Sequence, residues 1–317
     1  MKLWPTKNSA SLGWTAVDAG AEGICGASVR MSGANGGKPQ VVKCAVVNEP
    51  ELGAEALSRL AKMIAVPQFP WTMPLGRGEY KMMVLPEPAV KPAEMIDSLR
   101  WSLGTMLDFP AEEATLDWMP IPTLKHLPQR PQNLYAIVAR KDVVQRRAEP
   151  FRQMKMNLGA VDIRETAQRN IAVLLEKPGE ALGMVSINPQ GVEITFTFEG
   201  ELYLDRFIEE PLATAIAGND DSRNRMFERI TLQVQRSLDF VHRTLPFMPV
   251  GRIVIAPLPA PIALRDYLAQ NIAEPVEVMD LASVFDFSLT PELMAEEAQA
   301  RYFTALGATL RGTGEGE

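Results

Sequence analysis

Apolar residues along the chain follow two periods, one typical of strands and one typical of helices. Three short apolar runs come first, at Trp14–Asp18, Ile24–Met31 and Val41–Val47, and a glycine-containing turn joins the first two. Runs of this kind around a turn predict a β-meander. The next segment, Glu51–Ile64, has apolar residues at a helical spacing. We therefore expect the chain to begin as three strands and a helix.

Clusters of proline divide the following stretch, and strand and helix patterns alternate between them. A helix is expected to begin at Pro92, because proline suits the first turn of a helix. The expected elements are a strand at Lys81–Leu85, a helix at Pro92–Leu107, strands at Ala114–Met119 and Leu134–Ala139, and a helix at Asp142–Asn157 that Gly159 closes.

The second half repeats the opening order. A strand at Leu182–Ile187, a turn at Asn188–Gly191 and strands at Val192–Phe198 and Glu201–Arg206 predict a second meander. Further elements are expected at Arg223–Leu245 (helix), Arg252–Ala256 (strand), Ile262–Ile272 (helix), Val276–Met279 (strand) and Pro291–Arg311 (helix). Alternating strands and helices in two similar halves favour a two-lobed α/β fold.

Composition narrows the classes of function. The chain has 317 residues, 46% of them apolar, and a net charge of −7. The length favours two lobes, and the acidic balance argues against general nucleic-acid binding. No signal-peptide core opens the chain and no run reaches the roughly 18 apolar residues of a membrane span, so we expect a cytoplasmic protein. Cys25 and Cys44 are expected to be free thiols, and His126 and His242 are too few for a histidine-based metal site.

Four segments, in order, resemble the PilM family of actin-like components of type IV pilus machines. Ile96–Pro122 combines an Arg-Trp pair, a Phe-Pro break, an acidic pair and a strand with Asp and Trp. The other three are Gly159–Ala172, Gln233–Phe240 and Tyr302–Arg311. Within the family, the proline after the Asp-Trp strand looks most like the members that serve mannose-sensitive haemagglutinin (MSHA) pili. The related GspL proteins of type II secretion continue into a membrane helix.

The resemblance implies a duplicated, ribonuclease H-like actin (ASKHA) fold with an inserted α+β subdomain in the first lobe. The parts are then expected as follows: 1–85 first lobe, 86–161 inserted subdomain, 162–180 a helix returning to the first lobe, 181–290 second lobe, 291–311 a C-terminal helix packing on the first lobe, and 312–317 a disordered tail.

An actin-like nucleotide site needs loops that this sequence keeps only in part. The first hairpin retains Asp18, Gly20 and Gly23, which suit hydrated magnesium and close phosphate approach. In the second hairpin the family's Asp-Ile-Gly turn is replaced by Asn188–Gly191, and proline removes an amide donor. Of the family pattern only Gly191 remains for close phosphate approach, and Asn188 stands in place of the Asp. A proline-rich run, Pro257–Pro261, stands where the family has a Gly-Gly pair under adenine.

The remaining cofactor position implied by the family lies on a helix that contacts the ribose, where Gln233 replaces an acidic residue and Arg236 remains. We therefore predict a degenerate nucleotide site, no catalytic residues, no metal, and no bound cofactor. Mg-ATP binding or hydrolysis by unusual loops is the alternative.

Partner binding is then expected to be the function. The resemblance implies a groove between the first lobe and the inserted subdomain that takes the N-terminal cytoplasmic tail of a PilN-like inner-membrane protein. The candidate groove residues are Leu99, Leu103, Leu107, Phe109, Leu116 and Trp118, although a helical stripe of this kind is also typical of a core. The expected location is cytoplasmic and peripheral to the inner membrane through that partner, and the pilus assembly ATPase is a further candidate partner. A GspL-like secretion component and a self-assembling filament are the alternative functions.

Overall fold

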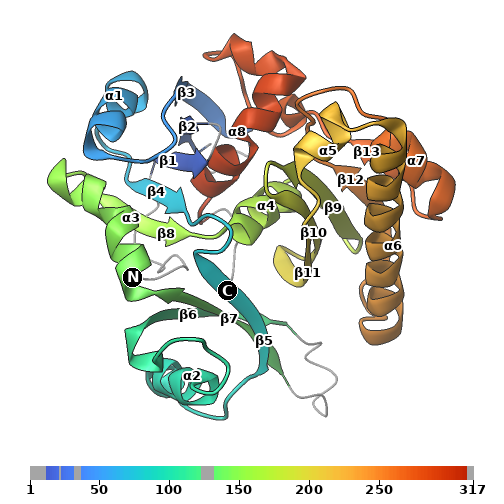
Figure 1. Ribbon diagram of the computed structural model, residues 1–317, viewed down its shortest axis with the longest axis horizontal. Coiled ribbons are helices and arrows are strands. Elements are labelled where there is room, and N and C mark those ends of the chain that lie inside the picture. Colours follow the sequence, from blue (N-terminus) through green and yellow to red (C-terminus); the bar gives the residue numbers. More distant parts are fainter. Residues whose placement is uncertain (1–11, 21–22, 32–36, 123–131, 313–317) are drawn as a thin grey trace.

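The computed structural model describes residues 12–20, 23–31, 37–122 and 132–312 (Figure 1). Its strands are β1 (Gly13–Gly20), β2 (Gly23–Arg30), β3 (Gln40–Val47), β4 (Trp71–Pro74), β5 (Tyr80–Pro86), β6 (Ala114–Ile121), β7 (Asn133–Arg140), β8 (Leu158–Asp162), β9 (Ala181–Asn188), β10 (Gly191–Phe198), β11 (Glu201–Ile208), β12 (Val250–Ile255) and β13 (Val276–Val278). Its α-helices are α1 (Ala54–Ile64), α2 (Met95–Leu103), α3 (Lys141–Gln153), α4 (Arg164–Val173), α5 (Leu212–Ala217), α6 (Asp220–Thr244), α7 (Leu264–Asn271) and α8 (Glu296–Thr309).

Two five-stranded sheets share one topology. The first has the order β3-β2-β1-β4-β8 and the second the order β11-β10-β9-β12-β13. In each sheet an antiparallel meander is followed by two strands that pair in parallel. The two-lobed α/β fold expected from the sequence is therefore confirmed, with a smaller third sheet, β5-β7-β6, below the first lobe (Figure 1).

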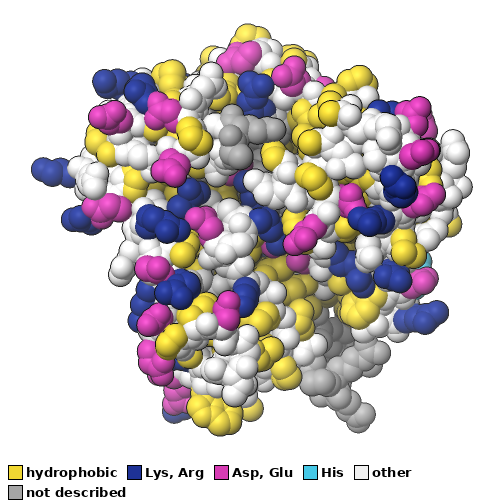
Figure 2. All heavy atoms as spheres, in the orientation of Figure 1, with side chains coloured by type: hydrophobic (Ala, Val, Ile, Leu, Met, Phe, Trp, Pro, Cys, Tyr) yellow, Lys and Arg dark blue, Asp and Glu magenta, His cyan; other side chains and the backbone are white. Residues whose placement is uncertain are grey.

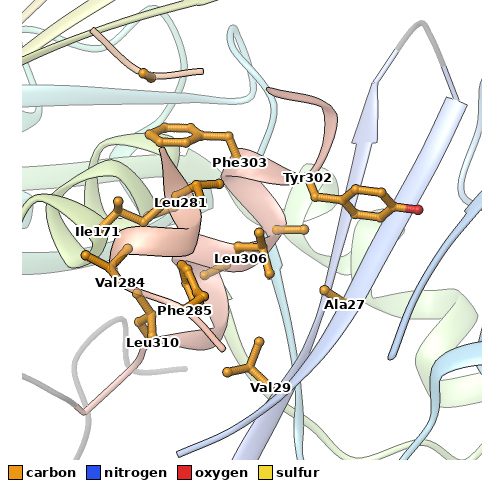
Figure 3. Close-up of a cluster of buried hydrophobic side chains, with 14 of the residues drawn as sticks. Ala27, Val29, Ile171, Leu281, Val284, Phe285, Tyr302, Phe303, Leu306 and Leu310 are labelled. Carbon is orange, nitrogen blue, oxygen red and sulfur yellow. The ribbon is translucent and has the colours of Figure 1, made fainter. Parts of the chain in front are cut away.

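Helices α4 and α8 join the lobes. Their apolar side chains form one cluster with residues of both large sheets, including Val29 from the first and Met184 from the second (Figure 3). The two helices approach at a glycine: a Cβ on Gly307 would lie 2.2 Å from the carbonyl oxygen of Ala167. Asn170 on α4 also donates to the carbonyl of Gly307, at 3.0 Å. Close backbone contact thus fixes α4 against α8.

The structure corrects several expected elements. Strands β4 and β8 were not predicted; β4 has only four residues, all buried, within a proline-rich stretch that carries no alternation. The helix expected at 92–107 is a 3-10 turn followed by α2, which ends at Leu103. The helix expected at 142–157 ends at Gln153, because Lys155 takes a positive φ of 53°. Gly159 therefore lies in β8 and does not cap a helix.

The predicted boundary of the inserted subdomain at residue 86 is wrong. β5, which was assigned to the first lobe, pairs along its whole length with β7. At the other end, β8 completes the sheet of the first lobe. The inserted subdomain therefore runs from β5 to α3, and the loop after β4 is the connection into it.

Two further assignments change. Helix α4 was expected on the first lobe, but it packs on α8 and on strands β9, β10 and β11 of the second. The segment before residue 290 was assigned to the second lobe, yet Asp286 forms a parallel bridge with Gln40 beside the first sheet. Helix α8 packs on β1 and β2, as expected for the C-terminal helix. The tail at 313–317 lies outside the described residues.

Both cysteines are free thiols, as expected. Cys25 is buried and Cys44 is partly buried; burial raises the pKa of both, to about 12 for Cys44. Across the parts of the chain that the structure describes, no helix has the length and apolar character needed to cross a membrane.

We predict that Gly307→Ala lowers the free energy of unfolding by about 1–3 kcal/mol, because the new methyl group has to displace backbone of α4. The matched control is Gly104→Ala, at the exposed end of α2, where the nearest atom lies 3.4 Å from the new Cβ. That change is expected to be neutral within about 0.5 kcal/mol. Urea denaturation of both variants measures the difference, and equal losses would contradict the close approach of the two helices.

Candidate functional site

A cleft of about 440 Å³ lies between the two lobes. The first hairpin contributes Asp18, Gly20 and Gly23 to its lining, and the second contributes residues 188–190. The structure thus brings together four of the predicted cofactor residues, the fourth being Asn188. Ala21 and Glu22, at the tip of the first hairpin, lie outside the described residues. α5 and α8 complete the walls of the cleft.

The carboxylate of Asp18 is paired with a guanidinium inside the cleft. Oδ1 of Asp18 lies 2.9 Å from Nη2 of Arg164, and the two side chains are only 13% and 10% exposed. Nη1 of Arg164 also donates to the hydroxyl of Thr304 on α8, at 3.1 Å. Because the negative charge of Asp18 is already compensated, its attraction for a hydrated cation is reduced.

The turn of the second hairpin is closed by its own side chain. Oδ1 of Asn188 accepts hydrogen bonds from the amides of Gln190, at 2.9 Å, and Gly191, at 3.0 Å. Pro189, which precedes Gln190, carries no amide hydrogen. Three successive positions that would face a phosphate therefore offer it no free backbone donor.

Gly191 is required by the neighbouring strand. A Cβ at this position would lie 2.3 Å from the carbonyl oxygen of Ile208 and 2.5 Å from the ring of Phe207. The close packing of β10 against β11 therefore leaves no room for a side chain at position 191. The prediction that Gly191 permits close phosphate approach receives no support from this geometry.

Gln233 and Arg236 do not reach the cleft. Both lie on α6, whose apolar stripe packs on the outer side of the second lobe (Figure 1). The structure therefore does not bring Gln233 and Arg236 together with the other predicted cofactor residues. The cleft is lined instead by Leu212 and Ile216 of α5, a short helix that was not predicted. In the proline-rich loop, Pro259 borders the cleft, and the buried Leu258 donates its amide to Glu296, at 3.4 Å.

A second, apolar groove of about 30 Å³ lies between the first lobe and the inserted subdomain. Its lining is almost entirely apolar and comes from β6, β7, α3, β8 and the residues flanking β4 and β8. The lining residues are Leu75, Thr115, Leu116, Asp117, Ile137, Ala139, Val144, Val161 and Ile163. Among the described strands, β6 and β8 are each at the edge of their sheet. Two strand edges with backbone groups available for pairing thus border the groove.

Most of the predicted groove residues lie on the other side of the inserted sheet. Leu99 and Leu103 on α2 are buried, and they pack with Leu116 in a core between the helix and the sheet. Leu107, Phe109 and Trp118 are partly buried around this core. Of the six, only Leu116 also borders the groove.

Strand alternation explains why the predicted groove residues lie on the α2 side of the sheet. Side chains alternate between the two faces of β6, and Leu116 and Trp118 take the face toward α2. Thr115 and Asp117 take the opposite face, where they pair with Ala139 and Ile137 of β7. The signal for this second face was present, because β7 is apolar at every position from Leu134 to Ala139, which is typical of a strand buried on both sides.

Of the two histidines, only His242 lies within the described residues. Nε2 of His242 on α6 lies 3.7 Å from a carboxylate oxygen of Glu274, and His126 lies outside the described residues. On the molecular face in Figure 2, Lys and Arg side chains are interspersed with Asp and Glu. This mixture gives that face no continuous basic surface for a nucleic-acid backbone.

Comparison with known proteins relates the fold to solved structures. No family model matches the chain, and no curated protein matches its sequence. A chain of the PilM-PilN type IV pilus biogenesis complex is 17% identical, with a TM-score of 0.74, over 95% of this chain and 99% of that one. The fold is therefore the two-lobed actin-like fold that the resemblance implies.

Two other structures are more distant. A Bacteroides thetaiotaomicron protein with an actin-like ATPase fold is 11% identical over 90% of this chain and 97% of that one, with a TM-score of 0.47. The cytoplasmic domain of EpsL from Vibrio cholerae, an inner-membrane component of the type II secretion system, is 8% identical over 66% and 76%, with a TM-score of 0.43.

We predict that Asn188→Ala lowers the free energy of unfolding by about 1–2 kcal/mol, because the amides of Gln190 and Gly191 lose their acceptor. Asn188→Asp keeps an acceptor oxygen at the same place and is expected to stay within about 0.5 kcal/mol of the wild type. Urea denaturation compares the two. Equal stability of the alanine variant and the wild type would show that the side chain does not hold the turn.

Proposed function

We propose that the chain is a cytoplasmic actin-like assembly component of a type IV pilus machine that binds the N-terminal cytoplasmic tail of a PilN-like inner-membrane protein. The observation that carries the proposal is the apolar groove between β6 and β8. The likeness of fold to a chain of the PilM-PilN complex over 95% of this chain supports the class of partner. Association with the inner membrane would come through that partner, and contact with the pilus assembly ATPase would link it to the motor.

The groove suits an extended apolar peptide. A peptide that runs along the edge of β6 or β8 adds a strand and gains main-chain hydrogen bonds. Its alternate side chains would then enter the apolar lining, which includes Ile137 and Val144. Affinity would come from the backbone pairing and specificity from the side-chain contacts.

We also propose that the pilus is of the MSHA type, as in MshI proteins. The support is the sequence Asp117-Trp118-Met119-Pro120 within the segment that resembles the family. A GspL-like role in type II secretion is the alternative, and the identity of the tail that binds the groove separates the two.

The interlobe cleft, in this proposal, serves as a scaffold and the protein is a pseudo-ATPase. Pairing of Asp18 with Arg164 and closure of the second hairpin by Asn188 support this role. Two observations favour the alternative, a nucleotide-binding protein. The space beside Gly20 is open, and Arg164 and Arg301 both line the cleft. Compensated charges and occupied amides weigh more, because they are the groups that would hold magnesium and phosphate.

We predict that calorimetric titration of the purified chain with Mg-ATP gives no saturable binding in the micromolar range, and that no nucleotide co-purifies. Binding of the PilN-like tail by the same preparation is the control for a folded, competent protein. A dissociation constant in the micromolar range or below would contradict the pseudo-ATPase proposal. Sedimentation as a polymer at modest concentration would instead favour the filament alternative.

We predict that Thr115→Arg and Val144→Arg each weaken binding of a synthetic PilN-like tail peptide by tenfold or more, about 1.4 kcal/mol. Both side chains are partly exposed at the groove, so the charged group can reach solvent in the free protein while obstructing the peptide. The matched variant is Trp118→Ala, which changes the α2 face of the same strand and is expected to alter the affinity by less than about threefold. Loss of binding in Trp118→Ala alone, with both arginine variants unaffected, would place the tail on the α2 side and contradict the groove.

A further inference from the structure

Three carboxylates, two of them buried and one partly buried, lie around a single cation where the loop into the inserted subdomain meets α4 and the second lobe. Glu165 at the start of α4, Glu193 on β10 and Asp205 on β11 each place an oxygen within 4.8 Å of the others. Glu165 is fully buried and Glu193 is 2% exposed. The cation is Arg77, from the loop that leads into the inserted subdomain.

Arg77 contacts two of the three acids. Its Nη1 lies 2.9 Å from Oε1 of Glu165, and its Nη2 is ion-paired with Oε2 of Glu193. The guanidinium also stacks on the ring of Phe207 on β11, 4.1 Å from the ring centre. Oδ1 of Asp205 is buried without a hydrogen-bond partner, and so are Oε1 of Glu165 and both carboxylate oxygens of Glu193, whose contacts with Arg77 are ion pairs. The inserted subdomain, α4 and the second lobe therefore meet at one guanidinium.

Other titratable and charged groups surround this cluster. Tyr80 on β5 donates its hydroxyl to Glu165, and Tyr135 on β7 is buried nearby, where the charges of Asp205 and Glu165 act on it. Two neighbouring cations have other partners: Arg147 of α3 is ion-paired with Glu79, and Arg164 is ion-paired with Asp18 in the cleft. Arg206 follows Asp205 on β11, so its side chain leaves the strand on the opposite face. None of them supplies a second cation to the three acids.

The charges do not balance when every acid is ionised, because three carboxylates face one guanidinium and leave a net charge of −2. Burying uncompensated charge is costly, so protons are the ready means of neutralising it. Burial, and next to it the charge of Asp205, raises the pKa of Glu165 to about 7. Burial raises the pKa of Asp205 as well, against the opposing effect of Arg77.

We propose that Glu165, Glu193, Asp205 and Arg77 form a proton-operated latch between the inserted subdomain and the two lobes. When two of the three acids carry a proton, the one remaining carboxylate is matched by Arg77 and the junction is closed. When the protons leave to solvent, the like charges repel one another and the junction loosens. Leu75 and Ile163 of the groove are each two residues from a latch residue, so the latch borders the groove whatever the groove binds.

A proton fits the cluster better than a metal ion. The guanidinium of Arg77 already contacts two of the three carboxylates, so a divalent cation coordinated by all three would lie within a few ångströms of a fixed positive charge. A metal ion is therefore an outcome of the experiment that would overturn the latch.

The direction of the pH effect follows from linkage. The pKa of Glu165 is higher in the folded chain than its ordinary value of 4.5. The folded state therefore holds more protons than the unfolded state between about pH 4.5 and about pH 7, and its stability falls as the pH rises through this window. For each proton released, the folding equilibrium constant falls by about tenfold per pH unit.

The test compares urea denaturation of the wild type and Asp205→Asn from about pH 5 to about pH 8. The variant keeps both contacts of Arg77 and removes one acid, so we expect a shallower fall with pH and a higher denaturation midpoint than the wild type at the alkaline end. Asp239→Asn, the same change at an exposed position on α6, is the control and should follow the wild type. Glu165→Gln, expected to behave like Asp205→Asn, replaces it if that variant does not fold.

Hydrogen exchange locates the effect. After correction for intrinsic pH dependence, amides of β5, β10 and β11 should lose protection on going to the alkaline end in the wild type but not in Asp205→Asn. An unchanged pH slope in both acid variants, or protection lost equally in Asp205→Asn, would overturn the latch. So would a rise in the wild-type midpoint on adding Mg²⁺ or Ca²⁺ that Asp205→Asn abolishes, because that result would identify a metal site.

Discussion

The rest of the molecule depends on burying a polar helix. From Arg164 to Ala172, every residue of α4 is buried, and six of these nine residues carry polar or charged side chains. A buried polar group without a partner destabilises the fold, so each of these side chains needs a partner from the surrounding elements. The contacts are Arg164 with Asp18, Glu165 with Arg77, Gln168 with Ser186 and Thr195, Arg169 with Glu201, and Asn170 with the carbonyl of Gly307. These partners come from both lobes, the loop into the inserted subdomain and α8, so α4 fixes their relative positions.

The burial of polar residues on α4 also relates the interlobe cleft to the apolar groove. Arg164 and Glu165 are successive residues, yet Arg164 points to Asp18 in the interlobe cleft and Glu165 to Arg77 on the side of the inserted subdomain. In the cleft, the ion pair between Arg164 and Asp18 joins α4 to the first hairpin. Recognition of a partner can then be placed at the apolar groove, where two strand edges offer backbone pairing.

Periodicity was sufficient for the duplicated architecture, because the two meanders and the long helix α6 have strong alternation or a long apolar stripe. It could not reveal β4, whose four buried residues include a proline and show no alternation. The boundary at residue 86 was wrong because β5 has the same local pattern whichever sheet it joins, and its pairing with β7 is a contact across about 50 residues of sequence.

For the candidate sites as well, the sequence pattern could not predict contacts between residues that are distant in the chain. The family resemblance implied that Asp18 and Asn188 belong to one nucleotide site, and the structure places both in the lining of the interlobe cleft. The sequence could not show that Arg164 pairs with Asp18 or that Asn188 caps its own turn, because both depend on side-chain geometry. Leu99 and Leu103 were predicted to line the partner-binding groove. They belong to the apolar stripe of α2, and this stripe forms the core between α2 and the inserted sheet. Gln233 lies beside the apolar stripe of α6 and is not among the residues that line the cleft.

The central claim is that the cleft holds its own charges together while the groove takes the partner. A crystal structure of the chain grown with both Mg-ATP and the PilN-like tail peptide tests it most directly. The account predicts peptide density along the edge of β6 or β8, with Asp18 still paired to Arg164 and no nucleotide between the hairpins. Nucleotide seated in the cleft with Arg164 moved away from Asp18, or peptide bound on the α2 side of the inserted sheet, would contradict it.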